Sequence, residues 1–392
     1  MNKNLLRKDV QDFIQENLKT DLSKLILKGS PFPEITVQEL AVQIKGVNTA
    51  KKKLPTWYKT HGIIFPPKLN LEQTSSEITA NYKAEIINGE RLIDITGGFG
   101  VDTYCFSKTF REVIYCEMNP ELAEVATHNF KELNAENIQV YAGDGIQILE
   151  KNTSQYDWIF IDPARRDNHG GKVFRLQDCL PNVPEHLKLL FSRTDNILIK
   201  TSPLLDLKAG LEELQNVLGI HIVSVENEVK ELLWVLTKNG NTEVQIKTIN
   251  FQKKGDQIFE GFFENEVVDI KYTLPKKFLY EPNPAIMKSG LFATLGQQTQ
   301  TAKLHPNSHL FTSEEEKEFP GRTFKIIDIK QFTKRELKKE FKGAKANITT
   351  RNFTETVSEI RKKLQIKDGG KDYLFFTTNL ENEKIVIKCR KL

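Results

Sequence analysis

The chain has 392 residues, which is too long for one ordinary hydrophobic core, so we expect two to four domains. A hydrophobic content of 39% and a charged content of 28% are typical of a folded soluble protein and exclude a largely disordered one. No apolar run reaches the ~18 residues that a membrane helix needs, and the N-terminus lacks the apolar core of a secretory signal. We therefore expect a cytoplasmic protein without a membrane partner.

The cysteine pattern indicates neither a metal site nor a disulfide framework. The four cysteines, at positions 105, 116, 179 and 389, form no C-x-x-C pair and show no metal-ligand spacing. Cys105 and Cys116 fall inside apolar segments, as small buried residues do. We expect reduced thiols and no bound metal.

Charge is distributed unevenly along the chain. Residues 321–392 contain nineteen Lys and Arg against nine Asp and Glu, a net charge of +10, whereas the other residues carry a net −6. A basic module on a mildly acidic body is expected when one part binds a polyanion and another part does chemistry. A lysine-rich surface that is merely solvated is the alternative.

Residues 1–73 are predicted to be helical. T-V-Q-E at 36–39 fits a capping box, in which the Thr and Glu side chains each satisfy a free backbone N–H group at a helix start. T-S-S-E at 74–77 has the same pattern and predicts a further helix, which ends near Asn88-Gly89.

Strands and helices then alternate up to residue 240. RLIDIT, EVIYCE, IQVYAG, YDWIFID and NILIKTS are apolar runs of strand length, and the segments between them, such as PELAEVATHNFKELN, have helical periodicity. This alternation predicts βαβ units and a parallel sheet with both faces covered. Too few residues join IHIVSVENEV to ELLWVLTK for a parallel crossover, so this last pair should be antiparallel.

The rest of the chain mixes strands and helices. Residues 241–276 contain strand-like segments that we expect to connect two domains. Residues 277–392 have an α+β pattern with antiparallel pairing, for which a ferredoxin-like fold is our expectation. We place a ferredoxin-like segment at 277–323 and a basic domain at 324–392.

LIDITGGFGVDT at 92–103 predicts a strand, a tight glycine-rich turn and a helix. Asp94 ends the strand, and the glycines that follow leave room for a ligand to lie against the backbone. A dinucleotide fingerprint needs a third glycine where this chain has Thr103. Glu117 ends the second strand, where a carboxylate can hold ribose hydroxyls. This indicates a cofactor that contains a nucleoside, whether or not it is a dinucleotide. A purely structural turn is the alternative.

The ordered motifs carry a resemblance. D-x-T-G-G-F-G, E-M-N-P, G-D-G and I-D-P-A-R-R resemble motifs I to IV of class I S-adenosylmethionine-dependent methyltransferases, and the first two are most similar to those of bacterial ribosomal-RNA guanine-N2 methyltransferases. With the tail segments A-N-I-T-T-R-N-F and D-G-G-K-D-Y-L-F-F, the whole chain resembles a bacterial group of methyltransferases with a THUMP-like C-terminal domain. This resemblance implies S-adenosylmethionine as cofactor, a Rossmann-like seven-stranded α/β sheet over 74–240, and a THUMP-like domain over 324–392.

The resemblance also implies roles for individual residues at the cofactor site. Asp94 would anchor the loop or the methionine amino group, the residues from Thr96 to Gly100 would cradle methionine and ribose, and Glu117 would hold the ribose hydroxyls. Most of the superfamily has glycine in place of Thr96, which is tolerable if its φ is negative. The helix start at 75–76 could hold the methionine carboxylate, with simple capping as the alternative. The expected cofactor-binding residues are Ser75, Ser76, Asp94, Thr96, Gly97, Gly98, Gly100, Glu117, Asp144 and Gly145.

Asp162-Pro163, after the fourth strand, are the expected catalytic residues. An exocyclic amine of a base is a poor nucleophile, and the Asp162 carboxylate and the main chain at Pro163 could accept its N–H bonds and stabilise the developing charge. An Asp that only caps the next loop is the alternative. Amine methyltransferases usually have an aromatic residue next, but Ala164-Arg165-Arg166 follows here. Either arginine could stack on a base, clamp a phosphate or form a structural ion pair.

Methylation at carbon 5 of uridine is disfavoured. That chemistry needs a cysteine nucleophile after the fifth strand, whereas this strand runs into Lys200-Thr201-Ser202-Pro203. Cys179 lies between predicted elements, beside Asp178.

THUMP-type modules bind RNA in tRNA-modifying enzymes, so the resemblance implies tRNA or rRNA as the partner. Basic side chains of the tail would contact phosphates, and Trp57 and Tyr58 could stack on unpaired bases or simply cover the core. A small molecule or a protein as substrate, or a nucleic-acid-binding protein that holds the cofactor without turnover, are the alternatives. The expected substrate-binding residues are Arg165, Arg166, Lys200, Arg351 and Arg361, with Lys362 and Lys363 beside them.

Overall fold

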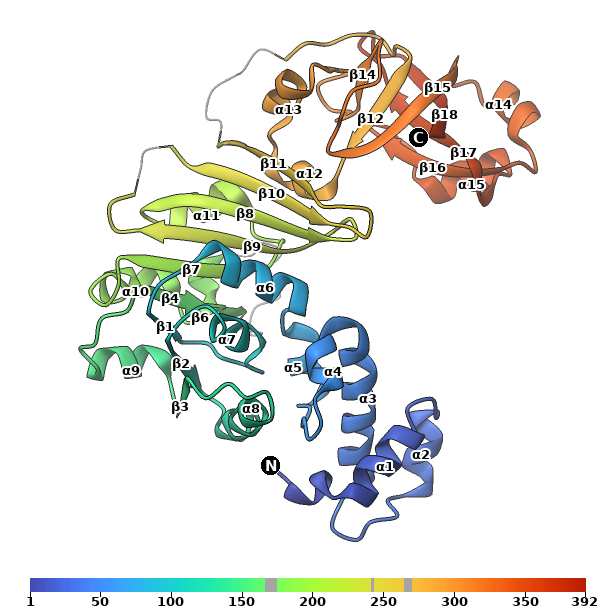
Figure 1. The fold of residues 1–392 in the computed structure, drawn as a ribbon. Coiled ribbons are helices and arrows are strands. Elements are labelled where there is room, and N and C mark those ends of the chain that lie inside the picture. The colour runs from blue at the N-terminus through green and yellow to red at the C-terminus, as the bar shows by residue number, and fades with distance from the viewer. Residues whose placement is uncertain (166–174, 241–242, 264–269) are drawn as a thin grey trace. The chain divides into compact units, whose positions relative to one another are not determined.

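The computed structural model describes residues 1–165, 175–240, 243–263 and 270–392 (Figure 1). Their contacts divide the chain into two units. The first comprises Met1–Leu218 and Leu233–Asn241, and the second comprises Gly219–Leu232 and Thr242–Leu392. The residues expected to form a separate N-terminal helical domain therefore belong to the first unit. No helix of the described residues combines the length and the apolar character needed to cross a membrane.

The first unit begins with short helices. They are η1 (Lys3–Leu6), α1 (Lys8–Glu16), α2 (Leu22–Lys28), α3 (Val37–Lys53), α4 (Pro55–Lys59), α5 (Lys68–Gln73) and α6 (Glu77–Ile86). The predicted capping box opens α3, because the Glu39 N–H donates to the Thr36 hydroxyl and the Thr36 N–H donates to the Glu39 carboxylate. Trp57 is 1% exposed and packs edge-on against Tyr104, so this aromatic residue covers the core.

A parallel sheet follows. Its strands are β1 (Arg91–Asp94), β2 (Glu112–Glu117), β3 (Ile138–Ala142), β4 (Trp158–Ile161) and β7 (Asn196–Thr201), in the order β7-β4-β1-β2-β3. The helices between and after them are α7 (Val101–Phe106), α8 (Pro120–Glu132), α9 (Gly145–Lys151), α10 (Val183–Leu190) and α11 (Leu207–Glu213). Asp94 is in register with Tyr115 on one side and Phe160 on the other. The residues that follow β1, β2 and β4 therefore meet at one edge of the sheet.

A short arm interrupts the alternation after β4. β5 (Ala164–Arg165) pairs antiparallel with β6 (Cys179–Leu180), and the 3-10 helix η2 (Leu176–Asp178) lies just before β6. α10 follows this arm, and its first turn lies near the carboxyl ends of β1, β2 and β4.

The last strands extend the sheet beyond the seven that the sequence predicts. β8 (Val217–Val225) and β9 (Glu228–Thr237) are adjacent, and the two residues between them, Glu226 and Asn227, both have positive φ, which is the geometry of a tight antiparallel hairpin. The antiparallel pair is thus confirmed. β10 (Gln245–Phe251) pairs parallel with β8, and β11 (Gln257–Phe262) pairs antiparallel with β10. Periodicity identifies these two strands but does not predict which strands they pair with.

The C-terminal part of the second unit contains one seven-stranded sheet in the order β13-β14-β12-β15-β18-β17-β16. Its strands are β12 (Phe278–Pro282), β13 (Ala302–Lys303), β14 (Phe311–Ser313), β15 (Gly321–Gln331), β16 (Lys345–Arg351), β17 (Lys367–Thr378) and β18 (Lys384–Lys391). The helices are α12 (Pro284–Ser289), α13 (Phe292–Thr299), α14 (Lys334–Phe341) and α15 (Val357–Leu364). β12 pairs with β15, so the segments that the sequence separates near residue 323 share a sheet. Pairing is antiparallel as expected, except between β16 and β17.

Candidate functional site

A cavity of about 400 Å³ lies where β1, β2 and β4 end in the first unit. Its described lining residues include six carboxylates and no Lys or Arg, namely Asp94, Asp102, Glu117, Asp144, Asp162 and Glu185. An anionic wall of this kind attracts a cationic ligand and repels the pyrophosphate of a dinucleotide. Asp102 and Asp162 pair with the buried Lys83 and Lys200, so the net negative charge is smaller than this count, but it still favours a cationic cofactor over a dinucleotide.

The turn after β1 is shaped for a ligand that lies against its backbone. Gly98 has φ +57, and a β-carbon on Gly97 would lie 2.1 Å from the Tyr115 ring, so both positions need glycine. The Tyr115 hydroxyl donates a hydrogen bond to the Gly98 carbonyl (2.5 Å). Burial raises the pKa of Tyr115 well above its ordinary value, which keeps this donor protonated. Sequence reasoning missed Tyr115, because an aromatic residue in an apolar strand gives no functional signal.

Asp94 and Thr96 tie the ends of β1 and β4 together. The Asp94 carboxylate accepts hydrogen bonds from the Thr96 N–H (3.0 Å) and the Thr103 hydroxyl (2.6 Å). The Asp162 N–H donates to the Thr96 hydroxyl oxygen (2.7 Å). Thr96 does not have a positive φ, so a threonine is tolerated where most of the superfamily has glycine. Thr103, which replaces the third glycine of a dinucleotide loop, thus serves to hold Asp94.

Burial raises the pKa of Asp94 to about 7, although the hydrogen bonds from Thr103 and Thr96 act in the opposite direction. The pKa in the folded protein then lies above that in the unfolded chain, so the stabilisation from this group is complete below about pH 4 and is lost as the pH rises through about 7. We expect Asp94→Asn to gain stability relative to the wild type over this range, measured by urea unfolding at several pH values. A constant difference between the two proteins would contradict the assigned pKa.

Glu117 and Asp144 line the cavity from the ends of β2 and β3. Glu117 accepts hydrogen bonds from the Gly98 and Asn119 N–H groups, both at 2.8 Å, and each carboxylate oxygen keeps a lone pair for a further donor. Asp144 caps α9 by accepting from the Ile146 N–H (2.8 Å). Both residues, with Gly145, line the cavity.

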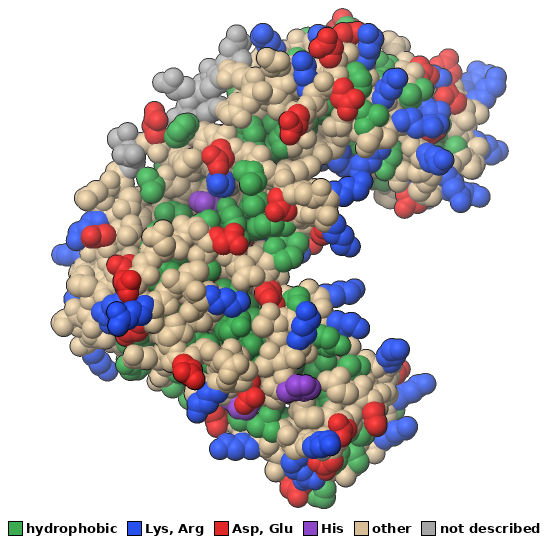
Figure 2. All heavy atoms as spheres, in the orientation of Figure 1, with side chains coloured by type: hydrophobic (Ala, Val, Ile, Leu, Met, Phe, Trp, Pro, Cys, Tyr) green, Lys and Arg blue, Asp and Glu red, His purple; other side chains and the backbone are tan. Residues whose placement is uncertain are grey.

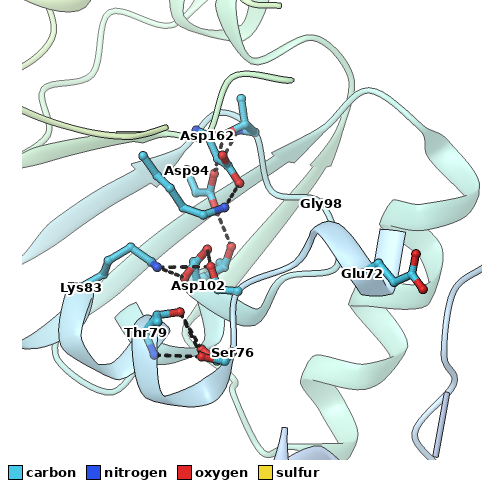
Figure 3. Close-up of polar contacts among 12 residues, drawn as sticks. Glu72, Ser76, Thr79, Lys83, Asp94, Gly98, Asp102 and Asp162 are labelled. Carbon is cyan, nitrogen blue, oxygen red and sulfur yellow. Dashed lines mark hydrogen bonds and ion pairs between the residues drawn. The ribbon is translucent and has the colours of Figure 1, made fainter. Parts of the chain in front are cut away.

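The helix start at 75–76 does not reach the cavity. The Ser76 hydroxyl caps α6, and the Ser75 hydroxyl donates to Asp102 (2.7 Å). Lys83 is fully buried and forms an ion pair with Asp102 (3.2 Å), toward which its side chain points in Figure 3. The residues that line the cavity on this side are instead Gln73 and Thr74, just before the helix. A lysine within an amphipathic helix gives no warning that it is buried, so Lys83 was missed.

Asp162 lines the cavity and contacts a second buried lysine. Lys200, on β7 next to β4, is 8% exposed and its ammonium group forms a close ion pair with the Asp162 carboxylate. Figure 3 shows Asp162 beside Asp94. Pro163 is buried and is not among the lining residues. The backbone of Arg165 lies in β5, and Arg166 lies outside the described residues.

Two of the basic residues expected to contact phosphates, Arg351 and Arg361, have partners within the protein. Glu281 is 3% exposed, and its carboxylate pairs with both Arg322 and Arg351. Arg361 pairs with Asp368 (2.5 Å) and also donates to a backbone carbonyl. Arg351 and Arg361 therefore have carboxylate partners within the C-terminal sheet.

Within the described ranges, no group of three or more His, Cys, Asp or Glu side chains is arranged to hold a metal ion. All four cysteines are buried, and none is among the described residues that line the cavity.

A cavity at the carboxyl ends of parallel strands, with a glycine turn after β1, a carboxylate after β2 and Asp162 after β4, defines a class I methyltransferase. The profile of protein-L-isoaspartate(D-aspartate) O-methyltransferases matches residues 67–168, a ferredoxin-like domain matches 278–320, and a THUMP domain-like profile matches 321–391. A crystal structure described as a "putative methyltransferase" from Porphyromonas gingivalis W83 is 32% identical and has a TM-score of 0.89, over 100% of this chain and 98% of that one. The chain belongs to the same family, the S-adenosylmethionine-dependent methyltransferases with a THUMP-like C-terminal domain.

Two curated proteins are similar over shorter stretches. An uncharacterized RNA methyltransferase of Mycoplasma mobile is 32% identical over 159 residues, which is 39% of this chain. A protein-L-isoaspartate O-methyltransferase of Rhodopseudomonas palustris is 36% identical over 76 residues, 19% of this chain. The chain spans 42% and 35% of the lengths of these two relatives.

Proposed function

We propose that the protein transfers a methyl group from S-adenosylmethionine to structured RNA, either tRNA or rRNA. The cofactor is a nucleoside with a sulfonium and an ammonium cation, and the anionic cavity fits that charge. Glu117 would hold the ribose hydroxyls, the turn from Thr96 to Gly98 would lie along the ribose and methionine, and Asp144 would face the adenine. Gln73 and Thr74 would contact the methionine end. The cofactor supplies the electrophilic methyl group, and the protein orients the acceptor for an in-line displacement.

The observation that carries RNA as substrate is an unpaired cationic surface in the THUMP-like domain. α14 and α15 cover one face of the sheet, and the turn after α14 meets the start of β17, where the Lys367 N–H donates to the Ala344 carbonyl (2.8 Å). Figure 2 shows Lys and Arg side chains gathered over these helices. The α14–α15 surface consists of exposed cations without a partner among the described residues, namely Lys334, Arg335, Lys338, Lys339, Lys342, Lys345, Lys362, Lys367 and Lys371.

Neutralising part of this surface should weaken RNA binding in a salt-dependent manner. For a triple Lys338→Gln, Lys339→Gln and Lys342→Gln variant, the slope of log affinity against log salt should fall by roughly 2 to 3, since each phosphate contact contributes about 0.7 to 0.9. Fluorescence anisotropy with total tRNA at several salt concentrations measures this slope. Lys330→Gln is the control, because Lys330 is already paired with Asp328 and Glu340. Equal slopes for the triple variant and the wild type would remove this surface from the proposal.

The function itself is tested by incubating the protein with methyl-labelled S-adenosylmethionine and total RNA from cells that lack the gene. Label in RNA, followed by nucleoside mass analysis, supports the proposal. Label in protein instead would contradict it and favour carboxyl methylation of the kind named for the isoaspartate family. Cofactor binding without transfer to any pool would favour a nucleic-acid-binding protein without turnover.

A further inference from the structure

The ion pair between Asp162 and Lys200 bears on which atom is methylated. Asp162 lines the cavity and its side chain is 35% exposed, whereas the Lys200 side chain is 10% exposed and is not among the lining residues. The lysine thus lies behind the carboxylate, and one oxygen of that carboxylate, Oδ2, is engaged by the ammonium group. An acceptor in the cavity would contact the Asp162 carboxylate, and the buried ammonium group of Lys200 would lie on the other side of that carboxylate.

An exocyclic amine suits this arrangement poorly. Its nitrogen gains positive charge as the new bond forms, and it needs hydrogen-bond acceptors for its N–H groups. At this site one carboxylate oxygen is already occupied, and the ammonium group of Lys200 offsets the negative charge that would stabilise a cationic nitrogen.

A hydroxyl group suits the arrangement well. It has one proton to lose, which the unpaired oxygen of Asp162 can accept, and its oxygen gains negative character as that proton leaves. The positive charge of Lys200 behind Asp162 therefore favours negative rather than positive charge at the acceptor. The balanced step forms one C–O bond as the methyl–sulfur bond breaks, with the electron pair remaining on sulfur, and the hydroxyl proton passes to Asp162 and then to solvent.

A second residue points to a bound group with hydrogen-bond donors. Asn182 lines the same cavity, and its side-chain oxygen is buried without a hydrogen-bond partner among the described residues. Its amide nitrogen donates to the Glu185 carboxylate (3.2 Å), which fixes the oxygen as the free acceptor. Buried acceptors are normally satisfied, so a donor from a bound nucleotide is expected there.

We propose that the acceptor atom is the 2′-hydroxyl oxygen of a ribose in RNA. Asp162 would be the catalytic residue that takes the proton, and Lys200 would be a positioning residue that holds the Asp162 carboxylate and places a positive charge behind it. This inference rests on RNA being the substrate. It replaces the exocyclic amine that the aspartate–proline motif alone suggests.

Alkaline hydrolysis of RNA labelled by the wild-type protein tests the acceptor atom directly. A 2′-O-methyl group removes the nucleophile for cleavage of the adjacent phosphodiester, so the label should be recovered in alkali-stable dinucleotides. Label in mononucleotides would show base methylation and overturn this inference while leaving RNA methylation intact. Absence of label from RNA would overturn the proposed function and this inference together.

Variants of Lys200 test its role independently of the product. We expect Lys200→Met to lower kcat at least 100-fold, while S-adenosylmethionine binding by calorimetry stays within about threefold, and Lys200→Arg to restore part of kcat because it keeps the charge. Lys247→Gln is the matched control, since it removes another strand lysine, paired with Glu260, outside the cavity. Full turnover by Lys200→Met, or loss of cofactor binding equal to its loss of kcat, would contradict a role toward the acceptor.

Discussion

Replacing Gly145 by alanine is expected to weaken S-adenosylmethionine binding by about 10- to 100-fold. A β-carbon at this position would lie 2.4 Å from the carbonyl oxygen and 2.8 Å from the α-carbon of Ile95, which leads from β1 into the glycine turn. Backbone atoms cannot rotate away as a side chain can, so the turn itself must move. Overpacking of this kind costs about 1–3 kcal/mol, and every 1.4 kcal/mol that falls on the bound state is tenfold in affinity.

Gly143→Ala provides the matched control for this prediction. It lies two residues earlier, has no positive φ, and its added β-carbon would meet only the end of the Ile148 side chain at 3.8 Å. Calorimetric titration with S-adenosylmethionine, with thermal unfolding alongside, compares the two variants. Equal affinities would mean that the contact between the turn before α9 and the end of β1 does not shape the cofactor site.

Asp162→Ala is expected to lower methyl transfer about 10²- to 10³-fold while leaving cofactor affinity nearly intact. The carboxylate lies at the end of β4 in the cavity, where it would face the acceptor, and removing one preorganised charged partner of a reacting group has effects of this size. Labelled methyl incorporation into RNA and calorimetry measure the two quantities. Retained turnover, or a parallel loss of cofactor binding, would be incompatible with a role for Asp162 toward the acceptor.

The same substitution should also destabilise the protein, because it leaves Lys200 buried without this counter-charge. Removing one partner of a buried ion pair costs about 3–5 kcal/mol, and less is expected here because Asp162 is partly exposed and Lys200 keeps other interactions. Adding Lys200→Met to Asp162→Ala should therefore recover stability in urea unfolding but not activity. This double variant separates the structural contribution of the ion pair from its chemical one.

Local sequence signals were sufficient for the part of the site that β1, α7 and β2 build. The strand ending at Asp94, the glycine turn and Glu117 are each read from a few consecutive residues, and the structure brings them to one cavity. Apolar runs of strand length likewise identify the parallel strands, because strands buried on both faces have no polar alternation.

Contacts between residues far apart in the chain could not be predicted from local sequence signals. Arg351 follows Glu281 by seventy residues, so its basic character in the tail suggested a phosphate contact and not a buried ion pair. Lys83 resembles any helix-surface lysine until the fold encloses it with Asp102. For Lys200, sequence reasoning indicated a residue at the site but not its contact with Asp162, which depends on the register of β4 and β7.

The pairing of β12 with β15 limits where a stable C-terminal fragment can begin. Five residue pairs join these strands, and Glu281 of β12 holds Arg322 and Arg351 from the two strands β15 and β16. A fragment beginning at residue 321 would lose this neighbour and present an unpaired strand edge, which invites aggregation. The boundary between the ferredoxin-like and THUMP-like profiles therefore falls inside one sheet, and a fragment meant to keep that sheet intact should begin no later than β12.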